Sequence, residues 1–162
     1  MKLPESDYLK CEHIGSVSRD MEDIEGFSIR HPETSSGVER YLKQDALADE
    51  CNSIMRTYMV RSKMTDEFVG FFSLKAGLVA INEQKASGNN ALFDTIPGVE
   101  LANFAIDKMA LGRLKHRGFG ATVFRTLIVP FIKKHAETLG IYDLYICSSI
   151  QSAYRDIRKL WL

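Results

Sequence analysis

The segment Lys115-His116-Arg117-Gly118-Phe119-Gly120-Ala121 has residue types that could bind an anion. It follows an apolar stretch with strand character and opens a stretch with helical periodicity. Glycines at such a junction let the backbone approach a ligand closely, and the first N–H groups of a helix have no partner within the helix. With the helix dipole and the neighbouring cations added, these groups are typical of a pyrophosphate site. The alternative is a tight turn with solvated basic side chains.

Other kinds of site are poorly supported by the residue pattern. The segment has no GxGxxG with an acidic residue spaced to bind a ribose, and no Gly-Lys-Ser/Thr of a P-loop. Three cysteines, Cys11, Cys51 and Cys147, are widely spaced without a CxxC, and the four histidines show no ligand spacing. We therefore expect no metal site and three buried thiols.

The strands and the helix expected on either side of the basic segment predict an α/β (α+β) fold. Val99–Ile106 is strongly apolar and predicts a strand buried on both faces. From Gly118 apolar residues recur at helical spacing, and Pro130 should kink this helix. Tyr142–Cys147 is a further strand. Strand, helix and strand in this order predict a parallel βαβ unit around the Gly118–Gly120 turn, within a mixed, mostly antiparallel sheet flanked by helices.

The middle of the chain predicts a hairpin that leads toward the strand at Val99. Thr57–Arg61 and Phe68–Leu74 are rich in β-branched and aromatic residues and are separated by a short polar connection. Ala76–Ile81 either extends the second strand or forms a helix. Asn82–Gly98 contains turn residues, so we expect a loop insertion there.

The first third of the chain predicts one strand and helical structure. Ile24–Ile29 is expected to be the first strand. Ser36 with Glu39 has the form of a capping box, and apolar residues follow at helical spacing. The phase of this pattern slips near Lys43–Asp45, which favours two helices.

Composition limits the class of protein. The chain has 162 residues with 21 Lys+Arg and 21 Asp+Glu, which suits one domain and argues against bulk electrostatic binding of nucleic acid, while leaving a local basic patch open. No apolar run approaches the roughly 20 residues that span a bilayer, so we expect no membrane partner. The N-terminus has no apolar signal-peptide core, so we expect a cytoplasmic protein.

Several motifs, taken in order, resemble the GNAT N-acetyltransferase superfamily. Lys115-x-x-Gly118-x-Gly120 is similar to its Arg/Gln-x-x-Gly-x-Gly/Ala signature, with Lys in the first position, and Leu101–Asp107 resembles its fourth strand. TYMV, VGFFSLKAG and IPGVELANFAID resemble the toxin-like branch, and the likeness covers Phe27 to Ser149. The family pattern continues with further strands, whereas Tyr154–Leu162 ends without them. The resemblance implies one N-acetyltransferase-like domain over residues 1–162 that lacks the last strands of the fold.

The resemblance implies an enzyme that transfers the acetyl group of acetyl-CoA to a primary amine by direct attack in a ternary complex. The pyrophosphate would be held at the basic segment, and the thioester would be oriented along the fourth strand. The implied cofactor-binding residues are Phe104, Ala105, Ile106, Lys115, His116, Arg117, Gly118, Phe119, Gly120 and Ala121.

Two residues are expected to move protons in such a reaction. Glu100 is a lone carboxylate in an apolar strand, where burial raises the pKa of a carboxylate toward a useful range, so it is the expected general base. The alternative is a salt-bridged Glu at the rim of the sheet. Tyr154 is the expected general acid for the thiolate, although it is out of the family's usual register.

The acceptor stays open at this point. It is a small molecule, a protein or, as in the toxin-like branch, aminoacyl-tRNA. A different class of function is a non-catalytic acyl-CoA-binding or interaction module, which the missing C-terminal strands favour. Members of the superfamily are often homodimers.

Overall fold

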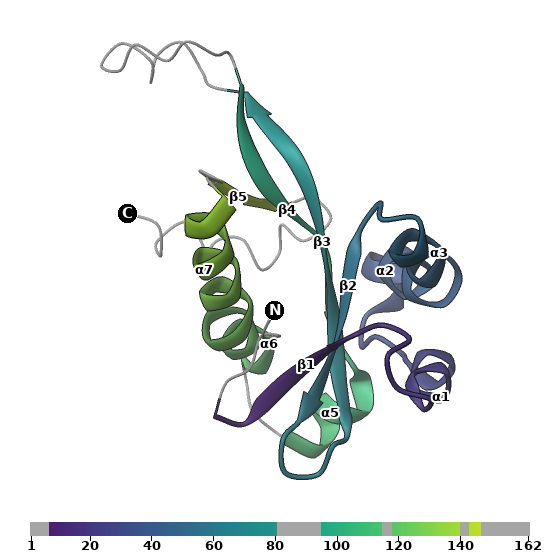
Figure 1. Cartoon of the computed structure of the whole chain (residues 1–162). Helices are drawn as coiled ribbons and strands as arrows, with labels where there is room; N and C mark the ends of the chain where they lie inside the picture. The colour runs from purple at the N-terminus through teal and green to yellow at the C-terminus, as the bar shows by residue number, and fades with distance from the viewer. Residues whose placement is uncertain (1–6, 81–94, 115–117, 140–142, 147–162) are drawn as a thin grey trace.

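The computed structural model describes residues 7–80, 95–114, 118–139 and 143–146, which form a sheet with helices on both faces (Figure 1). The strand order is β1-β2-β3-β4-β5, with antiparallel pairing from β1 to β4 and parallel pairing of β5 to β4. This mixed, mostly antiparallel sheet confirms the α+β class. The strands are β1 (Leu9–His13), β2 (Arg56–Ser62), β3 (Phe68–Ala80), β4 (Thr95–Ile106) and β5 (Asp143–Ile146).

The predicted hairpin is confirmed as β2 and β3, and β3 is longer than its first apolar stretch. Ala76–Ala80 extends the strand, which decides between the two expectations for that stretch. β4 begins at Thr95, so the last four residues of the predicted loop are part of a strand. Residues 82–94 of that loop lie outside the described residues. In Figure 1 the β3–β4 hairpin extends past the helices.

The helices divide between the two faces of the sheet (Figure 1). One group precedes β2, and the other lies between β4 and β5 in the sequence. The first group packs against one apolar cluster of the sheet and the second against another. The groups are α1 (Asp20–Gly26), α2 (Pro32–Gln44) and α3 (Ala46–Cys51), then α5 (Lys108–Leu114), α6 (Phe119–Val123), the π-helix η1 (Phe124–Ile128) and α7 (Val129–Leu139).

Two expectations for the first third of the chain are wrong. Ile24–Ile29 is not a strand, because Asp20 accepts the N–H groups of Gly15 and Val17 and the chain then enters α1. Ser36 does not begin a helix, since α2 starts four residues earlier with Pro32 in its first turn. The predicted break is confirmed, because α2 ends at Gln44 and α3 starts at Ala46.

Two apolar clusters, one on each face, make up the core. The aromatic residues expected in the core are there: Phe71 is in the cluster between the sheet and α1–α3, and Phe72, Phe124 and Phe131 are in the cluster between the sheet and α5–α7. Cys11 is buried, and burial raises the pKa of its thiol. Cys51 is exposed, contrary to expectation, because it ends the short helix α3 on the outer surface. Cys147 lies outside the described residues.

The helical stretch from Phe119 to Leu139 is irregular near the predicted point. Proline has no N–H to donate to the preceding turn. The π-helical residues Phe124–Ile128 come just before Pro130, and the Thr126 hydroxyl donates to the Thr122 carbonyl at 2.9 Å. A π-turn lets the helix pass the proline while Phe124, Leu127 and Ile128 stay buried on the sheet.

Candidate active site

Within the described residues, β5 covers one edge of β4 for only part of its length. β5 pairs with Gly98–Leu101, and among the described strands only β3 borders Ala102–Ile106. The strand groups that point away from β3 along this stretch therefore have no partner in β5. Such a row of N–H and C=O groups is a ready site for hydrogen bonds to a ligand.

The same part of β4 contains a β-bulge. Ser73 of β3 pairs with Asn103, but its neighbour Leu74 pairs with Leu101, so Ala102 is an extra residue in β4. Bulges redirect side chains and interrupt pairing near active sites. Here the extra residue places Glu100 and Asn103 on the same face of the sheet, opposite Lys75 and Ser73 respectively.

The glycine turn packs against side chains of this part of β4. Gly118 has a φ of 81°, in the left-handed region that favours glycine, and a Cβ placed there would meet nothing within 4 Å. A Cβ placed on Gly120 would lie 3.7 Å from Cγ1 of Ile106 and 4.0 Å from Cε1 of Phe104. The structure thus brings together two segments that the sequence separates by more than a dozen residues.

The helix start at this turn keeps its N–H groups available. Gly118 is the N-cap residue of α6 and supplies no side-chain cap. The first backbone bond of the helix runs from Thr122 N–H to the Gly118 carbonyl at 3.0 Å. The N–H groups of Phe119, Gly120 and Ala121 precede it and have no partner inside the helix. Lys115, His116 and Arg117 lie outside the described residues.

Asp107 fixes the end of β4 next to the turn. Its carboxylate accepts the N–H groups of Met109 and Ala110 at 2.5 and 3.1 Å, which caps α5. Its other oxygen accepts Ser28 N–H at 3.4 Å from the opposite face of the sheet. Sequence reasoning missed α5 and this role, although Asp107 directly before Lys108-Met109-Ala110-Leu111 is a helix-start signal.

Of the two residues expected to transfer protons, Glu100 and Tyr154, only Glu100 lies within the described residues. Glu100 lies on β4 between Lys75 of β3 and Tyr145 of β5, and it is half-buried. The expectation of a strand buried on both faces is therefore wrong at this point, because the helices leave this part of β4 partly open. Tyr154 lies outside the described residues.

The helices beside the turn form a basic surface. Residues 108–139 contain seven Lys or Arg and one acidic residue, whereas residues 1–53 contain six and twelve. The described cations of this surface are all exposed: Lys108, Arg113, Arg125, Lys133 and Lys134. Zero net charge therefore hides a strong separation of charge along the chain.

The described residues show neither a group of metal ligands nor a membrane-spanning helix. In the described ranges, no three His, Cys, Asp or Glu side chains are grouped as metal ligands would be. No helix within those ranges has the length and apolar character required to cross a bilayer.

Comparison with solved structures places this geometry in a known fold. A tyrosine-to-phenylalanine mutant of KacT matches with a TM-score of 0.71 over 96% of this chain and 86% of that chain, at 21% identity. AtaT complexed with acetyl-methionyl-tRNAfMet matches with a TM-score of 0.71 over 94% and 85%, at 18% identity. The chain has the fold of KacT and AtaT. AtaTR bound with AcCoA also matches, with a TM-score of 0.66 over 96% and 86% at 20% identity.

These neighbours are acetyltransferase toxins, so the resemblance to toxin-like N-acetyltransferases is confirmed at the level of the fold. No family model matches the sequence. Another neighbour is the AtaT toxin bound to the C-terminus of the antitoxin AtaR. At these identities the matches establish the fold alone.

Proposed function

We propose that this chain is an acetyl-CoA-dependent N-acetyltransferase whose acceptor is the amino group of aminoacyl-tRNA. The observation that carries the proposal is the packing of Gly120, in the glycine turn, against the side chains of Phe104 and Ile106 on β4, beside the stretch that the described part of β5 does not cover. That contact joins an anion-binding helix start to a strand edge with available hydrogen-bonding groups. A long cofactor with a diphosphate and an amide-containing arm needs both.

The described residues fit acetyl-CoA. The N–H groups of Phe119, Gly120 and Ala121 would bind the pyrophosphate, assisted by Lys115, His116 and Arg117. The space at Gly118 leaves room for the phosphates. The backbone of Phe104, Ala105 and Ile106 would bind the pantetheine arm and orient the acetyl group, which acetyl-CoA supplies in activated form. N–H groups aimed at the acetyl oxygen would stabilise the negative charge that develops there.

Glu100 is the proposed general base. An ammonium has no lone pair, so the acceptor must lose a proton before it attacks. Glu100 is half-buried, lies at the end of the β4–β5 pairing and faces the same side as Asn103. The carboxylate would accept that proton from the amine, directly or through one water. Tyr154 is the proposed donor to the departing thiolate.

The basic surface supports RNA as the carrier of the acceptor. Exposed Lys and Arg side chains on α5, η1 and α7 lie on the helices that flank the glycine turn. Phosphate contacts from such side chains provide sequence-independent binding to nucleic acid. A structural neighbour, AtaT, is complexed with acetyl-methionyl-tRNAfMet. A small-amine acceptor would leave this separation of charge without a role.

The test is transfer of labelled acetyl groups from acetyl-CoA to three acceptors: charged tRNA, the same tRNA after deacylation, and a polyamine. We expect label on charged tRNA only, and loss of the label after mild alkaline cleavage of the aminoacyl ester. Transfer to the polyamine alone would replace the tRNA acceptor with a small amine. Acetyl-CoA binding without transfer to any acceptor would favour the non-catalytic module.

A further inference from the structure

Asn103 is a polar residue at the bulge of β4 that the proposed reaction does not yet use. Because its Cα partner is Ser73, the two side chains lie on the same face of the sheet. The Ser73 hydroxyl is bonded to that of Thr57 at 3.0 Å, and Thr57 belongs to the strand face under α2. Asn103 therefore points toward the α1–α3 side, as Glu100 does.

The polar side chains next to Asn103 on this face of the sheet are hydrogen-bonded to one another. Tyr41 of α2 bonds to Thr57 at 3.2 Å, so Tyr41, Thr57 and Ser73 form a chain of three hydroxyl groups. Thr57 and Ser73 are fully buried. Burial raises the pKa of Tyr41, which keeps its hydroxyl protonated as part of this chain. These three hydroxyl groups are therefore already hydrogen-bonded within the protein.

The side-chain amide of Asn103 does not take part in this chain of hydroxyl groups. Asn103 is half-buried, and the hydrogen bonds among the described residues include none from its side chain. A half-buried amide without a protein partner is costly unless water or a ligand satisfies it. It lies beside the bulge, two register pairs from Glu100, or about 7 Å along the strand.

The chemistry of an amide suits one class of acceptor. It offers a carbonyl oxygen that accepts and an NH₂ that donates, side by side. An α-aminoacyl ester presents an amine and a carbonyl oxygen that are separated by one carbon. A simple alkyl amine or a lysine side chain has no such carbonyl beside its amine.

We propose that Asn103 recognises the α-aminoacyl group of the acceptor, with its oxygen accepting from the amine and its NH₂ donating to the ester carbonyl. This inference rests on the proposed function. It adds a residue that positions the amine beside Glu100 and selects aminoacyl groups over other amines.

The test compares Asn103→Leu, Asn103→Asp and the matched remote variant Asn52→Leu with the wild type on charged tRNA. Asn52 is exposed after α3, so the same chemical change there should leave the kinetics unaltered. We expect KM for charged tRNA to rise about tenfold in Asn103→Asp, which keeps only the acceptor, and about a hundredfold in Asn103→Leu. Calorimetric affinity for acetyl-CoA should stay within about twofold in every variant.

Different results would overturn the role of Asn103 and the proposed function. An unchanged KM in Asn103→Leu, with acetyl-CoA binding and transfer intact, would overturn the role of Asn103 and leave the proposed function standing. Equal losses in Asn103→Asp and Asn103→Leu together with weaker acetyl-CoA binding would point to a structural role and also overturn it. A wild-type protein that does not bind acetyl-CoA would overturn the proposed function itself.

Discussion

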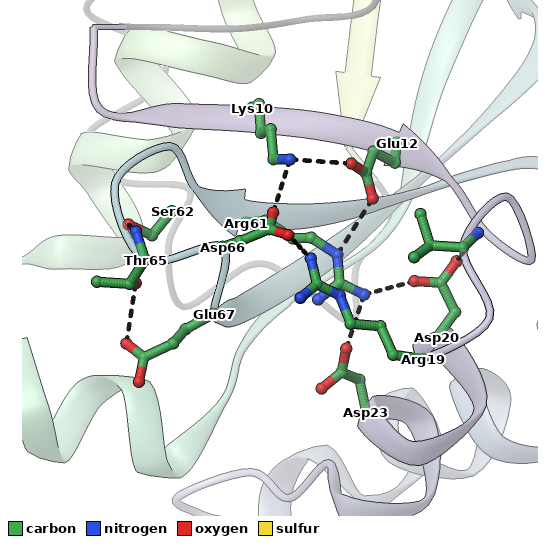
Figure 2. A network of polar contacts seen from close by, with 11 residues as sticks. Lys10, Glu12, Arg19, Asp20, Asp23, Arg61, Ser62, Thr65, Asp66 and Glu67 are labelled. Carbon is green, nitrogen blue, oxygen red and sulfur yellow. Dashed lines mark hydrogen bonds and ion pairs between the residues drawn. The ribbon is translucent and has the colours of Figure 1, made fainter.

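Two regions of the molecule differ in whether their polar groups have partners within the protein. Around Arg61, buried charges are matched within the protein (Figure 2). The Arg61 guanidinium is 1% exposed and contacts Asp20 at 2.5 Å, Asp23 at 2.7 Å and Glu12 at 3.2 Å. This network (the Arg61 cluster) joins β1, α1 and β2, and it raises the pKa of Arg61.

Along β4, polar groups are left available. The described part of β5 pairs with four residues of β4 and does not reach Ala102–Ile106, the helix start at Gly118 has no side-chain cap, and the Asn103 amide has no partner among the described residues. The Arg61 cluster joins three elements of the fold, whereas the β4 edge is the part of the molecule that we propose binds a ligand.

The largest expected effect is on stability. Arg61→Met should lower the free energy of unfolding by about 3–5 kcal/mol, because it leaves the buried carboxylate of Asp20 without its cation. Urea denaturation measures this loss. Arg113→Met is the matched control, since Arg113 is half-exposed and lies 3.8 Å from Glu67; it should cost less than about 1 kcal/mol. Equal losses in the two variants would contradict a special role for the Arg61 cluster.

A smaller effect, on rate alone, is expected at the β4 edge. Glu100→Gln should lower kcat/KM for charged tRNA about a hundredfold near neutral pH, because the amine loses its proton acceptor. The midpoint of urea denaturation should stay close to that of the wild type. If kcat/KM were unchanged across the pH range, Glu100 would not be the base.

The aromatic layer beside the sheet should respond to alkali. Burial, with a smaller contribution from Glu50, raises the pKa of Tyr58 from 10.0 to about 12. The unfolded chain then loses the phenol proton first, so stability is complete below pH 10 and declines as the pH rises to about 12. We expect Tyr58→Phe to lose about 1–2 kcal/mol less than the wild type over that interval. Parallel stability curves for the two proteins would show that Tyr58 does not titrate in this range.

The smallest effect is expected at an exposed pair on α2. Lys43 donates to Glu39 at 2.9 Å, and this bond lowers the pKa of the Glu39 carboxyl below 4.5. Lys43→Ala should cost about 0.3–0.5 kcal/mol at neutral pH, as an i,i+4 pair does. A lowered pKa means stability that is present above 4.5 and lost in acid, so the difference should shrink as the pH falls below 4.5 and be absent in strong acid. A difference that persists at pH 2 would have another cause.

The sequence predicted the features that depend on local pattern. The β2–β3 hairpin, the break between α2 and α3 and the helix opened by the glycine turn follow from periodicity, turn residues and breakers. These features also placed the glycine turn next to the fourth strand. Pro130 likewise marked the place where the long helix becomes irregular.

The features that were missed depend on pairing and tertiary context. The bulge at Ala102 exists only relative to β3, so no pattern within β4 could indicate that Glu100 and Asn103 share a face. Ile24–Ile29 has residues with strand preference, but Ile24–Gly26 belongs to α1, whose first residue, Asp20, accepts the N–H groups of Gly15 and Val17. In that case a side-chain contact outweighed the strand propensity of the segment.

The central claim is that the glycine turn and the β4 edge together bind acetyl-CoA. Calorimetric titration of acetyl-CoA into the wild type and Gly120→Leu tests it most directly, with unfolding midpoints measured in parallel. The account predicts saturable binding by the wild type and at least tenfold weaker binding by Gly120→Leu, because the new side chain fills the corner beside Phe104 and Ile106. Equal affinity of two equally stable proteins, or no binding by the wild type, would contradict it.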